Sequence, residues 1–161
     1  MLWLSDGNGS DDSGRIDFIA TDLAVANLVA ASDPQALGLH GIRAIVDASN
    51  REGNPRFPDI RYHEVPLADP DERFTEFVPG VVAFIDEARR SGPVLLHCLA
   101  GVSRSPALAI CYLHERCGLT LPGALRHVQS CRSQANPHPR FLRLIQEYYG
   151  ASLRGAGQED G

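Results

Sequence analysis

The sequence lacks any run of 18 apolar residues and therefore offers no candidate for a membrane-spanning helix. It also lacks an excess of positive charge: the net charge is -5, which argues against nucleic acid or an acidic membrane surface as the main partner. The first residues have neither the basic start nor the apolar core of a signal peptide, and position 2 is not the glycine that myristoylation requires. We therefore expect a soluble, cytoplasmic protein without a membrane anchor.

Cysteine is scarce and occurs only in the C-terminal half, at positions 98, 111, 117 and 131. The spacings form neither CxxC pairs nor another zinc pattern, so we expect no metal site. An even number of cysteines in a chain without a signal peptide is weak evidence for disulfides. We interpret Cys111, Cys117 and Cys131 as structural thiols, because free cysteine is commonly buried.

Length and composition fit one globular domain. The chain has 161 residues, of which 43% are hydrophobic and 22% charged, and this is enough to bury a core without disulfide or metal support. Residues 1–14 and 151–161 are rich in Gly, Ser and acidic residues, so we expect both segments to be flexible. The expected domain covers residues 15–150, without an internal repeat or linker.

Short apolar runs alternate with helical patterns along this domain. Strands are predicted over residues 16–20, 42–46, 61–65 and 94–97, whereas residues 23–29 are ambiguous between strand and turn. Helices are predicted over residues 34–40, 104–117, 121–131 and 140–149, and from the early seventies to about residue 90, with Asp33 and Thr120 as N-caps. This alternation predicts an α/β fold, with a central, mainly parallel sheet of about four to five strands flanked by helices on both faces. The strand over residues 94–97 is apolar on both faces and is expected at the centre of the sheet.

The most informative stretch joins this central strand to the helix that follows it. After Val94-Leu95-Leu96-His97 come Cys98, the small loop Leu99-Ala100-Gly101-Val102-Ser103, and then Arg104 and Ser105 at the start of an apolar helix. In open α/β sheets ligands bind beyond the carboxyl ends of the strands. A helix N-terminus and the backbone N–H groups of a tight loop attract anions at that place. The pattern therefore predicts an anion-binding loop next to the thiol of Cys98.

The chemistry of this stretch suits a phosphate group. A thiol attacks phosphorus only as a thiolate, and the loop N–H groups, the positive end of the helix and Arg104 would all stabilise that charge. Arg104 can hold two phosphate oxygens at once, which lysine cannot do. Ser105 can donate a hydrogen bond to the sulfur and so assist its departure. His97 is expected to point away from the phosphate and to orient the loop through hydrogen bonds.

The complete string from His97 to Ser105 resembles the signature loop of the protein tyrosine phosphatase superfamily, in the form typical of its dual-specificity branch. Gly41-Ile42-Arg43-Ala44-Ile45-Val46 is similar to the first buried strand of that branch, and Val65-Pro66-Leu67-Ala68-Asp69 is similar to its general-acid loop. The resemblance implies the compact fold of that branch and hydrolysis of phosphomonoesters through a phosphocysteine, without metal or cofactor. It also implies that Cys98 is the nucleophile, that residues 99–104 bind phosphate and that Asp69 is the general acid.

Two acidic residues compete for the role of general acid, which must give a proton to the leaving oxygen. The match to Val-Pro-Leu-x-Asp favours Asp69, whereas Asp71 and Glu72 are interpreted as first-turn residues of the next helix. The family usually has Pro-Asn before its last helix, and this sequence has His138 at the asparagine position. Either Asn136 supplies the supporting hydrogen bond of that asparagine, or this contact is absent; His138 itself is interpreted as an exposed loop residue.

The substrate is expected to be a phosphorylated protein. The chain is too short for the extra segments that form a deep, tyrosine-only cleft, so a shallow site that accepts phosphotyrosine, phosphoserine and phosphothreonine is expected. Residues 99–103 include no Lys or Arg, unlike relatives that cleave phosphoinositides. Arg51, Arg56 and Arg61 either border the mouth of the site or belong to a solvated loop. Two alternatives stay open: a phosphatase for a phosphoinositide, a nucleotide or an RNA 5′ phosphate, and a phosphate-binding scaffold with little turnover. The oligomeric state is open as well.

Overall fold

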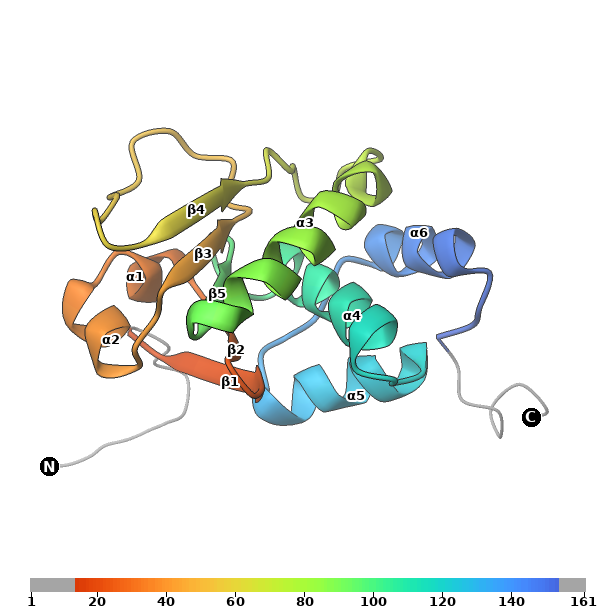
Figure 1. Ribbon diagram of the computed structural model, residues 1–161. Coiled ribbons are helices and arrows are strands. Elements are labelled where there is room, and N and C mark those ends of the chain that lie inside the picture. Colours follow the sequence, from red (N-terminus) through yellow and green to blue (C-terminus); the bar gives the residue numbers. More distant parts are fainter. Residues whose placement is uncertain (1–13, 154–161) are drawn as a thin grey trace, which may run out of the picture.

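The computed structural model describes residues 14–153 and contains a five-stranded sheet with the order β1-β2-β5-β3-β4 (Figure 1). The strands β1 and β2 are antiparallel, and the three other pairings are parallel. The prediction of a mainly parallel sheet with residues 94–97 at its centre is therefore confirmed. The five strands are β1 (Ile16–Ala20), β2 (Leu23–Ala26), β3 (Ala44–Asp47), β4 (Arg61–Glu64) and β5 (Val94–His97).

Helices cover both faces of the sheet, as expected for an α/β fold (Figure 1). The short helices α1 (Leu28–Ala31) and α2 (Pro34–Leu39) cover one face. The other face carries α3 (Phe74–Ala88), continued by the 3-10 turn η2 (Arg89–Ser91), together with α4 (Arg104–Arg116), α5 (Leu121–Cys131) and α6 (Pro139–Tyr149). Most of the hydrophobic core lies on this second face.

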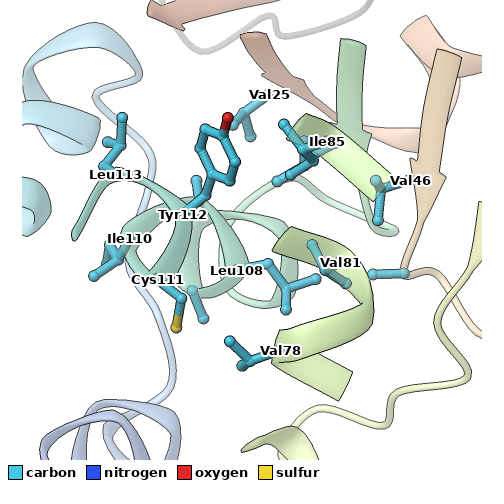
Figure 2. Packing of buried hydrophobic residues seen from close by; sticks show 14 of the residues in the cluster. Val25, Val46, Val78, Val81, Ile85, Leu108, Ile110, Cys111, Tyr112 and Leu113 are labelled. Atoms are coloured by element: carbon cyan, nitrogen blue, oxygen red, sulfur yellow. The ribbon is translucent and has the colours of Figure 1, made fainter. Parts of the chain in front are cut away.

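Alternation along the inner strands divides the core into two parts. Val94 and Leu96 of β5 join the core under α3–α6, whereas Leu95 joins the core under α1 and α2. Successive side chains of a strand point to opposite faces, so β5 is buried on both sides. Figure 2 shows Val25 and Val46 from the neighbouring strands beside residues of α3 and α4 on the larger side. This packing fixes the end of β5, where Cys98 follows.

Several predicted element boundaries are confirmed. The side chains of Asp33 and Thr120 cap α2 and α5 by accepting from Gln35 N–H and Gly123 N–H. The ambiguous segment 23–29 divides into strand β2 and the start of α1, whose N-cap is Asn27.

The predicted start of the third helix is wrong. α3 begins at Phe74, so Asp71 and Glu72 precede the helix and are not part of its first turn. The reason is local: the Asp71 carboxylate accepts hydrogen bonds from the backbone N–H groups of Ala68 and Arg73, and these bonds close a separate turn.

The cysteines are all free, but their burial differs from the expectation. Cys111 is buried and Cys131 partly so, whereas Cys117 is exposed. Burial raises the pKa of the Cys111 thiol to about 12, which makes it unreactive at neutral pH. The interpretation as a buried structural thiol therefore fits Cys111 best.

The segments predicted to be flexible lie mostly outside the described residues, which exclude residues 1–13 and 154–161. Within residues 14–153, no helix has the length and apolar character needed to cross a membrane.

Candidate active site

Cys98 lies directly after β5, at the carboxyl end of the central strand. Its side chain is almost fully buried, with 2% of the residue exposed. The sulfur is 3.3 Å from the Ser105 hydroxyl oxygen and 3.5 Å from the Ser105 backbone nitrogen. Ser105 is at the second position of α4, so the start of this helix places a hydroxyl group and a backbone N–H donor within hydrogen-bond distance of the sulfur. This is the Ser105–sulfur contact that the sequence predicted.

The backbone of the 98–105 loop has its carbonyl groups on the outside. Each carbonyl of residues 99–102 accepts a hydrogen bond from a neighbouring segment, whereas the N–H groups of residues 99–103 have no partner among residues 14–153. A loop bonded in this way directs its N–H groups toward its own centre, where they attract an anion. The donors to the carbonyls are Leu28 N–H for Leu99, Arg132 for Ala100 and Gly101, and Asn136 N–H for Val102.

Arg104 completes this concave surface at the start of α4. It is 9% exposed, and its Nη1 donates to the backbone carbonyls of Ser49 and Leu67, each at 2.9 Å. Its Nε is the one buried side-chain nitrogen or oxygen in the described part of the chain that has no hydrogen-bond partner. A buried donor without a partner costs about 1–3 kcal/mol, and an oxyanion bound beside Arg104 would remove that cost.

Arg132 is a site residue that sequence analysis missed. It is the C-cap of α5 and is fully buried, with 0% exposure. Its Nε donates to Gly101 O at 2.7 Å, Nη2 to Ala100 O at 3.2 Å, and Nη1 to a carboxylate oxygen of Asp17 on β1 at 2.9 Å. A single basic residue at a helix end gave no signal in the sequence, because its partners are more than 30 residues away.

His97 and Asp47 form a buried pair beneath the loop. Asp47 ends β3 and is the register partner of His97 on β5. Nδ1 of His97 lies 3.1 Å from Cys98 O and must donate to it, because a carbonyl only accepts. Nε2 is 3.5 Å from Asp47 Oδ1. Burial lowers the pKa of His97, and this outweighs the opposing effect of Asp47. His97 thus contacts the loop backbone, as predicted.

Asp69 is exposed and lies beside the loop. Its Oδ1 accepts a hydrogen bond from the Ser103 hydroxyl at 2.8 Å. The same hydroxyl oxygen accepts a bond from the backbone N–H of His138, also at 2.8 Å. The structure therefore brings Asp69, the 98–105 loop and the start of α6 together.

The competing residue Asp71 has a different environment. Its carboxylate is bound by the Arg73 side chain and by the backbone N–H groups of Ala68 and Arg73. The hydrogen bond from Arg73 is the main reason why the pKa of Asp71 is far below its usual value. These partners make Asp71 a residue that shapes the loop carrying Asp69.

Around position 138, where the family usually has asparagine, backbone N–H groups bind the 98–105 loop. Asn136 donates its backbone N–H to Val102 O at 2.7 Å. His138 is exposed and is the N-cap of α6, with Nδ1 accepting from Arg140 N–H. His138 is thus exposed, as expected, while its backbone N–H contacts Ser103. The backbone of Asn136 supplies a hydrogen bond to the loop.

The three arginines do not form one cluster. Arg61 is bound to Glu87 of α3, and Arg56 is paired with Glu64. Arg51 has no hydrogen bond or ion pair within residues 14–153. Arg51 and Arg56 line one cavity, and Arg61 is absent from its lining.

No three His, Cys, Asp or Glu side chains of residues 14–153 are grouped as ligands of a metal ion would be. The expectation that no metal is needed stays a prediction.

Comparisons with known proteins place these residues in a family context. Residues 24–151 match the model of the dual specificity phosphatase catalytic domain. The chain is 35% identical over 132 residues to dual specificity protein phosphatase 18 of Pongo abelii, an alignment that covers 81% of this chain and 70% of that protein. It is 36% identical over 140 residues to dual specificity protein phosphatase 1 of Arabidopsis thaliana, covering 84% of this chain and 70% of that one. The crystal structure of human DUSP28 superimposes with a TM-score of 0.77 at 28% identity, over 83% of this chain and 91% of that chain.

Proposed function

The chain belongs to the dual specificity phosphatase family, and from that premise we propose that it removes phosphate from tyrosine and from serine or threonine of proteins, with Cys98 as the nucleophile. One observation carries the proposal. The carbonyls of residues 99–102 are bonded outward, the N–H groups of residues 99–103 are left without partners, and the buried Nε of Arg104 has none either. A phosphate group would satisfy these donors and place its phosphorus near the Cys98 sulfur.

The first step transfers the phosphoryl group to the enzyme. The Cys98 thiolate attacks phosphorus, the sulfur–phosphorus bond forms and the bond from phosphorus to the substrate oxygen breaks. Asp69 gives its proton to the leaving oxygen. Because Oδ1 of Asp69 is held by Ser103, Oδ2 is the oxygen that donates. Arg104 and the loop N–H groups stabilise the charge on the transferred group.

The second step releases phosphate. A water molecule gives a proton to the Asp69 carboxylate and attacks phosphorus, and the sulfur–phosphorus bond breaks. The thiolate that leaves is stabilised by Ser105, whose hydroxyl is 3.3 Å from the sulfur. Inorganic phosphate then leaves, and Asp69 is protonated again for the next cycle.

Turnover of p-nitrophenyl phosphate in the presence of chelator and reductant tests the activity. We expect the native chain to hydrolyse it, and Cys98→Ser to abolish turnover while retaining phosphate binding. On a substrate with a poor leaving group, such as a phosphoserine peptide, Asp69→Asn should slow the chemical step by about two to four orders of magnitude, the range of a lost general acid. A native chain that binds phosphopeptides but releases no phosphate would contradict the proposal and favour a scaffold.

Asp71→Asn is the matched control for Asp69→Asn. Its effect should be smaller and independent of the leaving group, because Asp71 acts on the shape of the loop. A larger loss in Asp71→Asn would show that the acid assignment is wrong. A panel of phosphopeptides, phosphoinositides, nucleotides and 5′-phosphorylated RNA then measures the substrate class, and phosphopeptides should be turned over fastest.

A further inference from the structure

A second concave site adjoins the proposed phosphate site. The connection from β3 to β4 makes a wide arc at one edge of the sheet (Figure 1). Between this arc and the end of β4 lies a cavity of about 510 Å³, a size typical of ligand sites. It is lined by Asp47, residues 50–54, Arg56 and residues 64–66.

Two segments that line this cavity are adjacent in sequence to residues that bind Arg104. One wall begins at Asn50, immediately after Ser49, and the other ends at Pro66, immediately before Leu67. The carbonyls of Ser49 and Leu67 are the two acceptors of Arg104 Nη1. An extended peptide advances about 3.3 Å per residue, so a polypeptide whose phosphorylated residue is bound at Arg104 reaches the cavity within a few residues.

The arc is held in a defined shape. The Asn54 side chain donates to Asp47 Oδ2 at 3.0 Å and to the Ser49 hydroxyl at 2.8 Å, and Ser49 donates to Asp47 Oδ1. Burial acts to raise the pKa of Asp47, but the hydrogen bonds from Ser49 and Asn54 outweigh it and the pKa is lowered. Asn50 has a left-handed backbone, with φ of 57°, a conformation that asparagine adopts more readily than most residues. The cavity is therefore largely preformed.

Most charges in the cavity already have partners. Glu64 is paired with Arg56, whose guanidinium also lies over the Tyr62 ring. Asp47 is buried and hydrogen-bonded. Arg51 and Glu52 are exposed and have no partner within residues 14–153. The Arg51 guanidinium can bind a carboxylate with two parallel hydrogen bonds, and Arg51 is two residues from Ser49, whose carbonyl accepts from Arg104.

We propose that this cavity is a recognition subsite for the polypeptide segment next to the phosphorylated residue, and that Arg51 binds an acidic side chain of the substrate there. The inference rests on the proposed function and adds a specificity determinant to it. Arg51 touches no reacting atom in this arrangement, so it contributes to substrate affinity and leaves the chemical step unchanged.

Phosphotyrosine peptides test the subsite. Glu, Gln or Lys is moved through the four positions on each side of the phosphotyrosine, and kcat and KM are measured for each peptide. At one or two positions the native chain should prefer Glu over Gln by about two- to fivefold in kcat/KM, the range of an exposed ion pair. The preference should lie in KM and weaken as ionic strength rises. Arg51→Ala should remove it and leave turnover of p-nitrophenyl phosphate unchanged, because that substrate does not reach the cavity.

Two further variants serve as controls. Arg61→Ala removes a nearby arginine that is bound to Glu87, and it should keep the preference for Glu. Glu52→Gln should keep or increase that preference, because it removes a negative charge beside Arg51. A preference that is absent, that survives in Arg51→Ala or that favours Lys would overturn the subsite proposal. If the native chain does not turn over p-nitrophenyl phosphate, the proposed function fails separately, and the affinities of the same peptides for the native chain and for Arg51→Ala then decide the inference.

Discussion

The hydroxyl of Ser103 joins three segments that are far apart in the sequence. It donates its only proton to Asp69 Oδ1 and accepts a bond from His138 N–H. The donor at position 138 is a backbone group, so the change from the family's usual asparagine to histidine leaves this contact in place. In the proposed reaction Ser103 is therefore a positioning residue, which holds one oxygen of Asp69 and leaves the other without a hydrogen bond within residues 14–153.

Ser103→Ala should reduce catalysis in a way that depends on the leaving group. A lost hydrogen bond to a charged group is worth about 1.5–3 kcal/mol, so kcat for an alkyl phosphate should fall by about 10- to 100-fold. The effect on p-nitrophenyl phosphate should be much smaller, because its leaving group needs little help from an acid. Rates for a series of phosphate esters measure this.

Ser103→Thr and Ser133→Ala are the controls for this experiment. Threonine keeps the hydroxyl and should restore most of the activity. Ser133 is an exposed serine five residues before His138, and the loss of its hydroxyl should have no effect. An equal loss on all esters in Ser103→Ala would mean that the variant damages the loop as a whole.

At the scale of elements, the shape of the 98–105 loop is imposed by its neighbours. Gly101 has a φ of 70°, and a Cβ at this position would lie 2.8 Å from Ala26 O at the end of β2. It would also collide with the guanidinium of Arg132. The loop thus requires a residue without a side chain, both for its backbone conformation and for the close approach of β2 and α5.

Gly101→Ala should lower both stability and turnover. Backbone strain and overpacking each cost about 1–3 kcal/mol, so together they should lower the free energy of unfolding by about 2–6 kcal/mol in urea titrations. Turnover of p-nitrophenyl phosphate should fall as well, because Arg132 and the loop carbonyls are displaced.

Gly118→Ala provides a matched comparison for Gly101→Ala. Gly118 follows α4 with a φ of 75°, and nothing lies within 4 Å of a Cβ placed there. This variant should show only the cost of the left-handed backbone and keep full turnover. If the two variants behave alike, the close approach at Gly101 has no consequence.

For the whole molecule, the buried pair of His97 and Asp47 links stability to pH. The pKa of His97 is lowered, mainly by burial, so the folded protein favours the neutral ring. An unfolded chain takes up a proton on this histidine near pH 6.5. Below that pH the unfolded state binds more protons, and stability therefore falls as pH decreases toward the folded-state pKa. The Asp47 pKa is lowered from an already low value, so Asp47 contributes only at more acidic pH.

Urea unfolding at pH 7.5 and pH 5.5 measures this linkage. The native chain should be less stable at pH 5.5, and His97→Asn should show a smaller difference between the two pH values. His63 has a pKa that burial also lowers, so part of the difference should persist. His40→Asn, a change of a less buried histidine beside Phe18, should retain the native difference. A native stability that rises toward pH 5.5 would contradict the assignment.

Local patterns in the sequence were enough to predict the α/β class, the central position of residues 94–97 and the caps at Asp33 and Thr120. These features depend on neighbours within a few residues: apolar runs make buried strands, and a side-chain oxygen caps the N–H groups that follow it. The string from Cys98 to Ser105 also indicated its chemistry, because strand, loop and helix start are contiguous there. The start of α3 was missed, since Asp71 formed a turn whose bonds no propensity describes.

Only the tertiary structure decided which distant residues complete the site. Arg132 reaches the loop from 31 positions away in the sequence, Ser103 is bonded to Asp69 across 34 positions, and Ser49 meets Arg104 across 55. Arg51 also differs from Arg56 and Arg61 for a tertiary reason. Arg56 is paired with Glu64 and Arg61 with Glu87, whereas Arg51 has no ion pair within residues 14–153. The sequence determined the thiol, the loop and the helix behind it, because these interact with adjacent residues. The contacts that hold them come from side-chain packing between elements, and a single sequence carries no local signal for such contacts.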